Sequence, residues 1–216
     1  MTRPTTNKVD ELALKDAVSS WLSDPSGLGC LLTPDSPKSI PDPRPDAVGI
    51  RHVGGYLVGD FELITVLIRP STKRFTSVCG ETSAQSVHAD RTYLACYLGS
   101  EEFTEEQIDT ALYLGIGLLR IDSDRRCHRT VPAPLNHPTQ RMRASLLHQL
   151  GLVVCQLCGV SFSLFPEHEQ DDAVLWNERW ADRFGRLRNE SVYDRRHLCP
   201  DCVGNISELA TRDDNL

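Results

Sequence analysis

The sequence lacks several features that mark well-known classes of protein. No apolar run approaches the roughly 18 residues that a membrane helix needs, and the first residues contain no apolar core of a signal peptide. The chain contains no GxSxG elbow, no HExxH pair, no glycine-rich phosphate loop and no internal repeat. We therefore expect a soluble cytoplasmic protein that belongs to none of the enzyme classes with those signatures.

Lysine is scarce, whereas arginine is abundant. Only 4 of the 23 basic residues are lysines, and 30 acidic residues give a formal net charge of -7. This balance argues against a generally basic surface, but one span of the sequence is locally positive and suited to phosphate groups. Its arginines are Arg120, Arg125, Arg126, Arg129, Arg141 and Arg143. A second arginine cluster, over 179–196, is diluted by acidic residues and fits solvated helix faces better.

The size and the cysteine content favour one main domain with an appendage. The chain has 216 residues, of which 40% are apolar, enough for a substantial core. Four of its eight cysteines are scattered, namely Cys30, Cys79, Cys96 and Cys127. We interpret Cys79 and Cys96, which have apolar neighbours, as core thiols and not as half-cystines.

The other four cysteines form two pairs with the spacing of zinc ligands. Cys155 and Cys158 are separated by two residues, and so are Cys199 and Cys202. This spacing lets both sulfurs of a pair reach one tetrahedral ion at about 2.3 Å, so we predict a structural four-cysteine zinc site. Apolar residues recur at helical spacing after Cys202, and this order resembles a treble-clef finger. Two reduced or disulfide-bonded pairs without metal are the alternative.

Local patterns predict alternating helices and strands before the cysteine pairs. An amphipathic helix at 8–22, capped by Thr6 or Asn7, precedes a proline-rich extended loop at 33–45. We expect strands at 46–58, 61–69, 92–98 and 116–121, and helices at 80–90, 104–114 and 140–150. This order predicts an α/β fold with a mixed central sheet flanked by helices.

The sequence gives further detail for two of these helices and for the stretch after the last strand. The helix at 80–90 should turn Ala84 and Val87 inward, and the helix at 104–114 should begin with a capping box at Thr104 and end at Gly115. The stretch 124–139 is rich in proline, which predicts turns.

We place the domain boundary after residue 150. Residues 1–150 would form the main domain, including a linker and helix at 122–150, and residues 151–216 would form the zinc module. Inside the module, an insertion at 171–188 carries Trp176, Trp180 and other apolar residues on one helical stripe. We expect this stripe to pack against the main domain.

A series of local patterns runs through residues 8–121. They are Pro45-Asp46 with Gly49, the strand ending at Arg69, the basic turn at 70–75, the helix with Gln85, the stretch 89–95 and the helix-strand pattern of 104–121. Together they resemble the PD-(D/E)xK fold, which is also called restriction-endonuclease-like. In working members an aspartate and an acidic residue on the following strand hold Mg²⁺, and a lysine two positions later stabilises charge.

The metal-binding motif of that family is degenerate here. Asp46 matches the aspartate, but Leu67 stands where the acidic residue belongs and Arg69 where the lysine belongs. Leucine cannot ligate a hard cation, and arginine stays protonated near neutral pH although it binds phosphate. Asp60, Glu62 or Glu81 could replace the missing carboxylate and Lys73 the lysine. The catalytic set of such an active enzyme would be Asp46, Glu62, Arg69 and Lys73.

We therefore expect a protein that binds nucleic acid, or acts in a nucleic-acid-processing complex, without cutting it. The expected phosphate contacts are Arg69, Lys73, Arg74, Arg125, Arg126, Arg129, Arg141 and Arg143. Two alternatives stay open: an active Mg²⁺-dependent nuclease with migrated ligands, and a protein-interaction scaffold or homodimer that binds no nucleic acid. Cys127, His128 and His137 form a second, weaker candidate metal site.

Overall fold

The chain divides into two compact units. The computed structural model describes residues 10–31, 33, 44–53, 61–155, 161–163, 199 and 201–202. The first unit comprises residues 1–51 and 63–138, and the second comprises 52–62 and 139–216. This division places the residues from 139 to 150 in the second unit, whereas the sequence pattern places them in the main domain. Within the ranges given above, no helix is long and apolar enough to cross a bilayer.

A five-stranded mixed sheet forms the centre of the first unit, in the order β1-β2-β3-β4-β5. β2 is parallel to β3, β3 is parallel to β4, and β4 is antiparallel to β5. The strands are β1 Ala47–His52, β2 Phe61–Arg69, β3 Arg91–Tyr97, β4 Gly117–Ile121 and β5 Cys127–Val131. Because β2, β3 and β4 are parallel, their carboxyl ends lie along one edge of the sheet, which we call the carboxyl edge.

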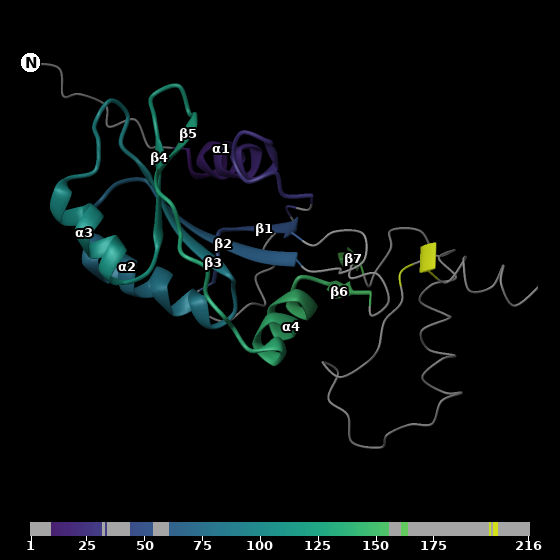
Figure 1. Cartoon of the computed structure of the whole chain (residues 1–216). Coiled ribbons are helices and arrows are strands. Elements are labelled where there is room, and N and C mark those ends of the chain that lie inside the picture. Colours follow the sequence, from purple (N-terminus) through teal and green to yellow (C-terminus); the bar gives the residue numbers. More distant parts are fainter. Residues whose placement is uncertain are drawn as a thin grey trace, which may run out of the picture. The chain divides into compact units, whose positions relative to one another are not determined.

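Helices cover both faces of this sheet (Figure 1). Helix α1 (Glu11–Ser23) buries Leu14, Val18 and Leu22 against one face, where Ile64 and Tyr93 also lie. Helices α2 (Phe75–Ala84) and α3 (Glu105–Tyr113) cover the other face. β2 is buried along eight of its nine residues, as expected for a strand with apolar layers on both sides. The expected α/β class with a mixed sheet and flanking helices is confirmed.

Local capping explains where two of the helices begin and end. The Thr104 side chain accepts a hydrogen bond from the Gln107 backbone N–H, and the Gln107 side chain accepts one from the Thr104 N–H, so the expected capping box is present. Gly115 follows the helix in the left-handed conformation with φ of 66°. The cap of α1 is Asp10, which accepts a hydrogen bond from the Leu12 N–H, and the expectation of Thr6 or Asn7 was wrong.

Two other expectations were wrong. The second helix spans Phe75–Ala84 and continues as a 3₁₀ turn, η1 (Gln85–Val87), so it begins five residues before the expected position. Its buried residues are Cys79, Thr82 and Gln85, whereas Ala84 and Val87 are exposed. The stretch 124–139 also contains an edge strand, β5, that its turn-like composition did not indicate.

The described part of the second unit contains helix α4 (Gln140–Gln149) and a two-stranded antiparallel sheet. The strands are β6 (Leu152–Val154) and β7 (Ser161–Ser163). Gly151, in the left-handed conformation with φ of 71°, ends α4 as expected. Most of the proline-rich loop at 33–45, the aromatic stripe of 171–188 and Cys158 lie outside the described residues.

Candidate metal centre and carboxyl edge

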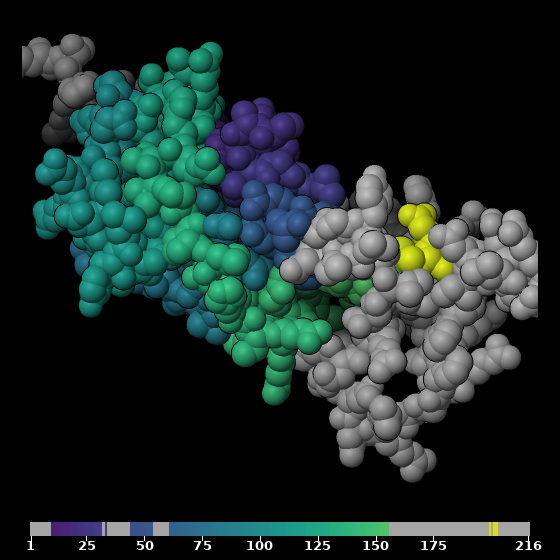
Figure 2. All heavy atoms as spheres, in the orientation of Figure 1, coloured from purple at the N-terminus to yellow at the C-terminus, as the bar shows by residue number. Residues whose placement is uncertain are grey.

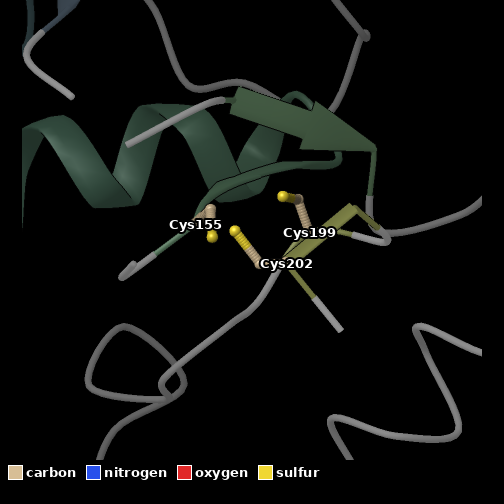
Figure 3. Close-up of side chains that lie close together, drawn as sticks. All are labelled: Cys155, Cys199 and Cys202. Carbon is tan, nitrogen blue, oxygen red and sulfur yellow. The ribbon is translucent and has the colours of Figure 1, made fainter. Parts of the chain in front are cut away.

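Three of the four predicted zinc ligands meet in the second unit. The Sγ atoms of Cys155, Cys199 and Cys202 all lie within 4.8 Å of one another, and the three residues are buried. Cys155 directly follows β6, and Asp201 and Cys202 have helical backbone conformation. Figure 3 shows the three side chains pointing toward a shared space. The sequence spacing therefore predicted a real cluster, although its first and last members are far apart in the chain.

This cluster has the geometry and chemistry of a site for a soft metal. Four sulfurs at about 2.3 Å from a tetrahedral ion are about 3.8 Å from one another, a separation that fits within the observed limit. Thiolates are the ligands that select zinc or iron–sulfur centres over Mg²⁺. The three cysteines could therefore hold a metal ion, and Cys158 is the natural candidate for a fourth ligand.

The second, weaker metal candidate does not assemble in the described part of the chain. The group of three cysteines is the one potential metal-ligating group found there, and it does not include Cys127, His128 or His137. His128 instead pairs with Asp122, with 2.7 Å between Nε2 and Oδ2. Cys127 packs against the α1 side of the core, and burial raises the pKa of its thiol to about 12. Cys127 and His128 thus make contacts within the first unit.

Asp46 and Arg69 meet at the carboxyl edge. Asp46 precedes β1, and its backbone N–H donates to the carbonyl of Val66, which places it beside the end of β2. Its Oδ2 accepts the Ile68 N–H at 2.7 Å and lies 3.1 Å from Nη1 of Arg69. The structure therefore brings together two of the candidate site residues that the sequence pattern singled out.

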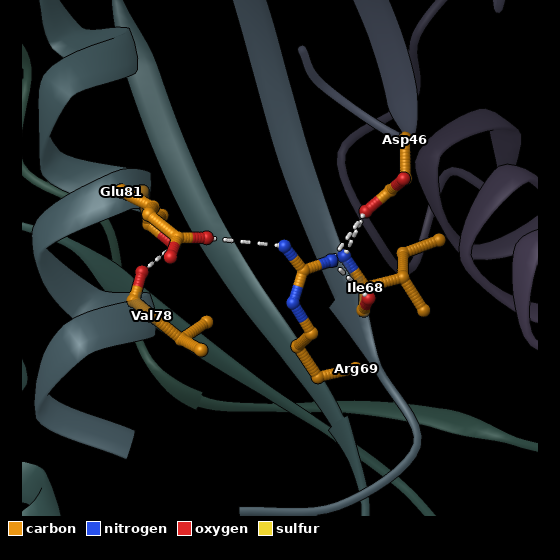
Figure 4. A network of polar contacts seen from close by, with 6 residues as sticks. Asp46, Ile68, Arg69, Val78 and Glu81 are labelled. Atoms are coloured by element: carbon orange, nitrogen blue, oxygen red, sulfur yellow. Dashed lines mark hydrogen bonds and ion pairs between the residues drawn. The ribbon is translucent and has the colours of Figure 1, made fainter. Parts of the chain in front are cut away.

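Arg69 also contacts a second carboxylate. Its Nη2 lies 3.3 Å from Oε2 of Glu81, which comes from α2. Figure 4 shows the guanidinium group of Arg69 between Asp46 on one side and Glu81 on the other. The second carboxylate of this cluster, Glu81, thus comes from helix α2. The positively charged side chain of Arg69 occupies the space between the two carboxylates.

The other residues of the hypothetical catalytic set do not join this cluster. Glu62 is buried at the opposite end of β2, so a migrated ligand from this position is not supported. Lys73 is exposed in the loop after β2. Leu67 is 2% exposed and packs with Leu94 and Cys79 in the apolar layer under α2 and α3. The position expected for the second metal ligand is therefore part of the hydrophobic core.

Exposed cations gather along the carboxyl edge. Lys73 and Arg74 follow β2, and Arg125 and Arg126 lie in the turn after β4, so the parallel strands bring both pairs to the same edge. In the space-filling view the β4–β5 turn protrudes from the surface (Figure 2). Arg120, close by, is paired with Glu102 at 3.3 Å. These four side chains are the candidate phosphate contacts that the structure brings together.

The remaining candidate phosphate contacts differ in their surroundings. Arg129 is exposed on β5, and Arg141 is exposed on α4 in the second unit. Arg143 lies with its guanidinium carbon 4.4 Å from the centre of the Phe61 ring and donates a hydrogen bond to the Phe61 carbonyl oxygen. The Arg143 side chain is therefore used in contacts within the second unit and is a weaker candidate for binding phosphate.

Asp122 holds the β4–β5 turn through its hydrogen bonds, so we expect its contribution to folding stability to depend on pH. Hydrogen bonds from the Arg126 N–H and from His128 lower the pKa of Asp122 below its ordinary value of 3.8. A carboxyl with a depressed pKa adds stability above its unfolded pKa, and this contribution is lost as the pH falls through the lower, folded value. We expect Asp122→Asn to be less stable than the native chain above about pH 4, with the difference disappearing at lower pH.

Urea unfolding of both proteins between about pH 6 and pH 2 measures this difference. Asparagine keeps one oxygen that can accept the Arg126 N–H but lacks the second carboxylate oxygen that faces His128, so the change removes the charge of Asp122 together with this contact. A stability difference that stays constant over this pH range would show that the charge of Asp122 does not hold the turn.

A scan against protein-family models, a search of curated proteins and a search of solved structures each return no match for this chain. What the fold and the sites define is an α/β protein with a mixed sheet and a cluster of three cysteines. The resemblance to PD-(D/E)xK nucleases stays a prediction, because a mixed sheet alone does not identify that fold.

Proposed function

We propose that the carboxyl edge of this protein binds the phosphate backbone of nucleic acid and does not cut it. The observation that carries this proposal is the position of Arg69 between Asp46 and Glu81. In our interpretation the first unit is a degenerate nuclease-like domain in which an arginine has taken the place of the catalytic metal ion.

The chemistry of Arg69 supports binding over catalysis. Mg²⁺ requires several oxygen ligands, and the two nearby carboxylates already contact the guanidinium group. Arginine cannot act as a general base near neutral pH, because its pKa is above 12. The ion pairs also neutralise negative charge that would otherwise repel a phosphate.

The exposed cations at the same edge supply the attraction. Lys73, Arg74, Arg125 and Arg126 are all exposed, and none of their side chains makes a hydrogen bond or ion pair within the described part of the chain. The overall charge of -7 means that nucleic acid would be held at this edge and repelled elsewhere. A local basic site on an acidic protein fits a defined binding surface more than general adhesion to polyanions.

We further propose that the cysteine cluster holds a structural Zn²⁺ with Cys158 as its fourth ligand. Support comes from the meeting of Cys155, Cys199 and Cys202 and from the helical backbone at Cys202. In this arrangement, which the treble-clef resemblance implies, the ion would tie the end of β6 to the second pair and stabilise the second unit.

Gel mobility-shift measurements with DNA and RNA test the binding proposal. With four phosphate contacts we expect a plot of the logarithm of the affinity against the logarithm of the salt concentration to have a slope of about -3. The affinity should then fall roughly 60-fold between about 50 and 200 mM salt. Incubation with Mg²⁺ or Mn²⁺ should leave the nucleic acid intact.

Two results would contradict this proposal and favour the alternatives. Cleavage that disappears in Asp46→Ala would show an active metal-dependent nuclease. Absence of any shift at low salt, together with a stable oligomer in light scattering, would favour an interaction scaffold or homodimer.

A further inference from the structure

Two arginines at the carboxyl edge have an unusual backbone conformation. Arg74 has φ of 56° and Arg125 has φ of 61°, and they are the two non-glycine residues with positive φ in the described part of the chain. The other four described residues with positive φ are glycines. Side chains with a Cβ are disfavoured in this left-handed region, where glycine is the residue that adopts it without a steric penalty.

Both arginines follow strands of the same parallel set. Arg74 directly precedes α2 in the loop after β2, and its carbonyl accepts the Val78 N–H. Arg125 lies in the turn after β4, where its N–H donates to the carbonyl of Asp122. In each case the backbone is held by hydrogen bonds that do not involve the arginine side chain, so glycine could replace the residue without losing those bonds.

The two loops are rigidly placed relative to each other by the sheet. β2 and β4 both pair with β3, so the ends of β2 and β4 are separated by two strand spacings, or about 10 Å. On the β4 side, both carboxylate oxygens of Asp122 hold the turn through the Arg126 N–H and the His128 ring. The exposed guanidinium groups of Arg74 and Arg125 are therefore presented from fixed backbones.

We propose that Arg74 and Arg125 form a two-point clamp for a chain of phosphates, such as the backbone of a nucleic acid, with Lys73 and Arg126 as flanking contacts. This inference rests on the proposed function and deepens it by naming the two residues that grip the ligand and by specifying a ligand with linked phosphates. A strained residue is kept where its side chain has a use, since glycine would relieve the strain. Two cations on separate loops suit a ligand with several linked phosphates better than a single phosphate.

The substitution Arg74→Gly together with Arg125→Gly tests the clamp. Glycine relieves the strain, so each change should raise the melting temperature by roughly 2–4 °C. Binding of a fluorescent single-stranded oligonucleotide should weaken, and the salt slope should fall by about 1 for each arginine removed. Lys15→Gln on α1, outside the two loops, is the control for loss of one positive charge.

The outcomes separate the clamp from the proposed function. If the native chain binds no oligonucleotide, the proposed function fails and the clamp fails with it. If the native chain binds and the double variant binds equally well, only the clamp is wrong. A double variant that melts at a lower temperature would show that the arginines support the fold. Inorganic phosphate, added at the same total concentration of phosphate groups as the oligonucleotide, should not displace it. Displacement under these conditions would contradict the proposal that the clamp binds linked phosphates.

Discussion

Cys199→Ser is expected to remove the bound metal and unfold most of the second unit. Structural zinc contributes about 10–16 kcal/mol in small zinc modules, which is as large as the total stability of a typical domain. The described part of the second unit has a helix of ten residues and two strands of three residues, which offer little core to compensate. We expect about one zinc ion per native chain and almost none in the variant.

Elemental analysis and limited proteolysis measure the two parts of this prediction. Proteolysis of the variant should cut within 139–216 and leave the first unit intact, because that unit has its own core on both faces of the sheet. Cys127→Ala is the matched control: it removes a cysteine from the first unit and should leave the zinc content unchanged. Iron in place of zinc, or zinc retained after Cys199→Ser, would contradict the assignment.

Short-range chemistry explains why much of the first unit could be predicted from its sequence. The capping box at Thr104 and the left-handed Gly115 are decided by residues within one turn of the helix. The near-continuous apolar run of β2 is typical of a strand that is buried on both faces, so its burial could be predicted from the sequence. The cysteine cluster could also be predicted from the sequence, because a spacing of two residues within each pair lets both sulfurs bind the same ion.

Long-range pairing explains what the sequence did not reveal. β5 has three consecutive exposed residues and is a strand because it pairs with β4, a contact that local composition does not encode. The start of α2 was missed because Arg74 at its N-cap makes no side-chain capping bond. The phase of that helix places Glu81 opposite Arg69, whereas Glu62 lies at the other end of β2. Both facts depend on how the helix and the strand pack, so the sequence alone left the acidic partner of Arg69 open.

Arg69→Ala is expected to convert the carboxyl edge into a weak divalent-cation site. The change leaves Asp46 and Glu81 without the cation that they contact, at side-chain exposures of 34% and 47%. We expect a loss of about 1–2 kcal/mol of folding stability, because these partly exposed ion pairs are screened by water. Binding of nucleic acid should also weaken by about tenfold, since two uncompensated carboxylates would repel phosphate.

Thermal melting with and without Mn²⁺ provides the decisive measurement. At about ten times its dissociation constant, Mn²⁺ bound to the folded state adds about 1.4 kcal/mol, so the melting temperature of Arg69→Ala should rise by roughly 3–5 °C. The native chain should show no such rise, because the guanidinium group already occupies the space between the carboxylates.

The double variant Arg69→Ala with Glu81→Gln separates a metal site from a general salt effect. Removing one carboxylate relieves the repulsion with Asp46, so this variant should regain stability in the absence of metal and lose most of the response to Mn²⁺. If Mn²⁺ instead stabilises the native chain and Asp46→Ala abolishes that effect, a metal binds beside Arg69 in the native protein. Arg69 would then be the partner of a metal ion, and the carboxyl edge would have to be treated as a catalytic site.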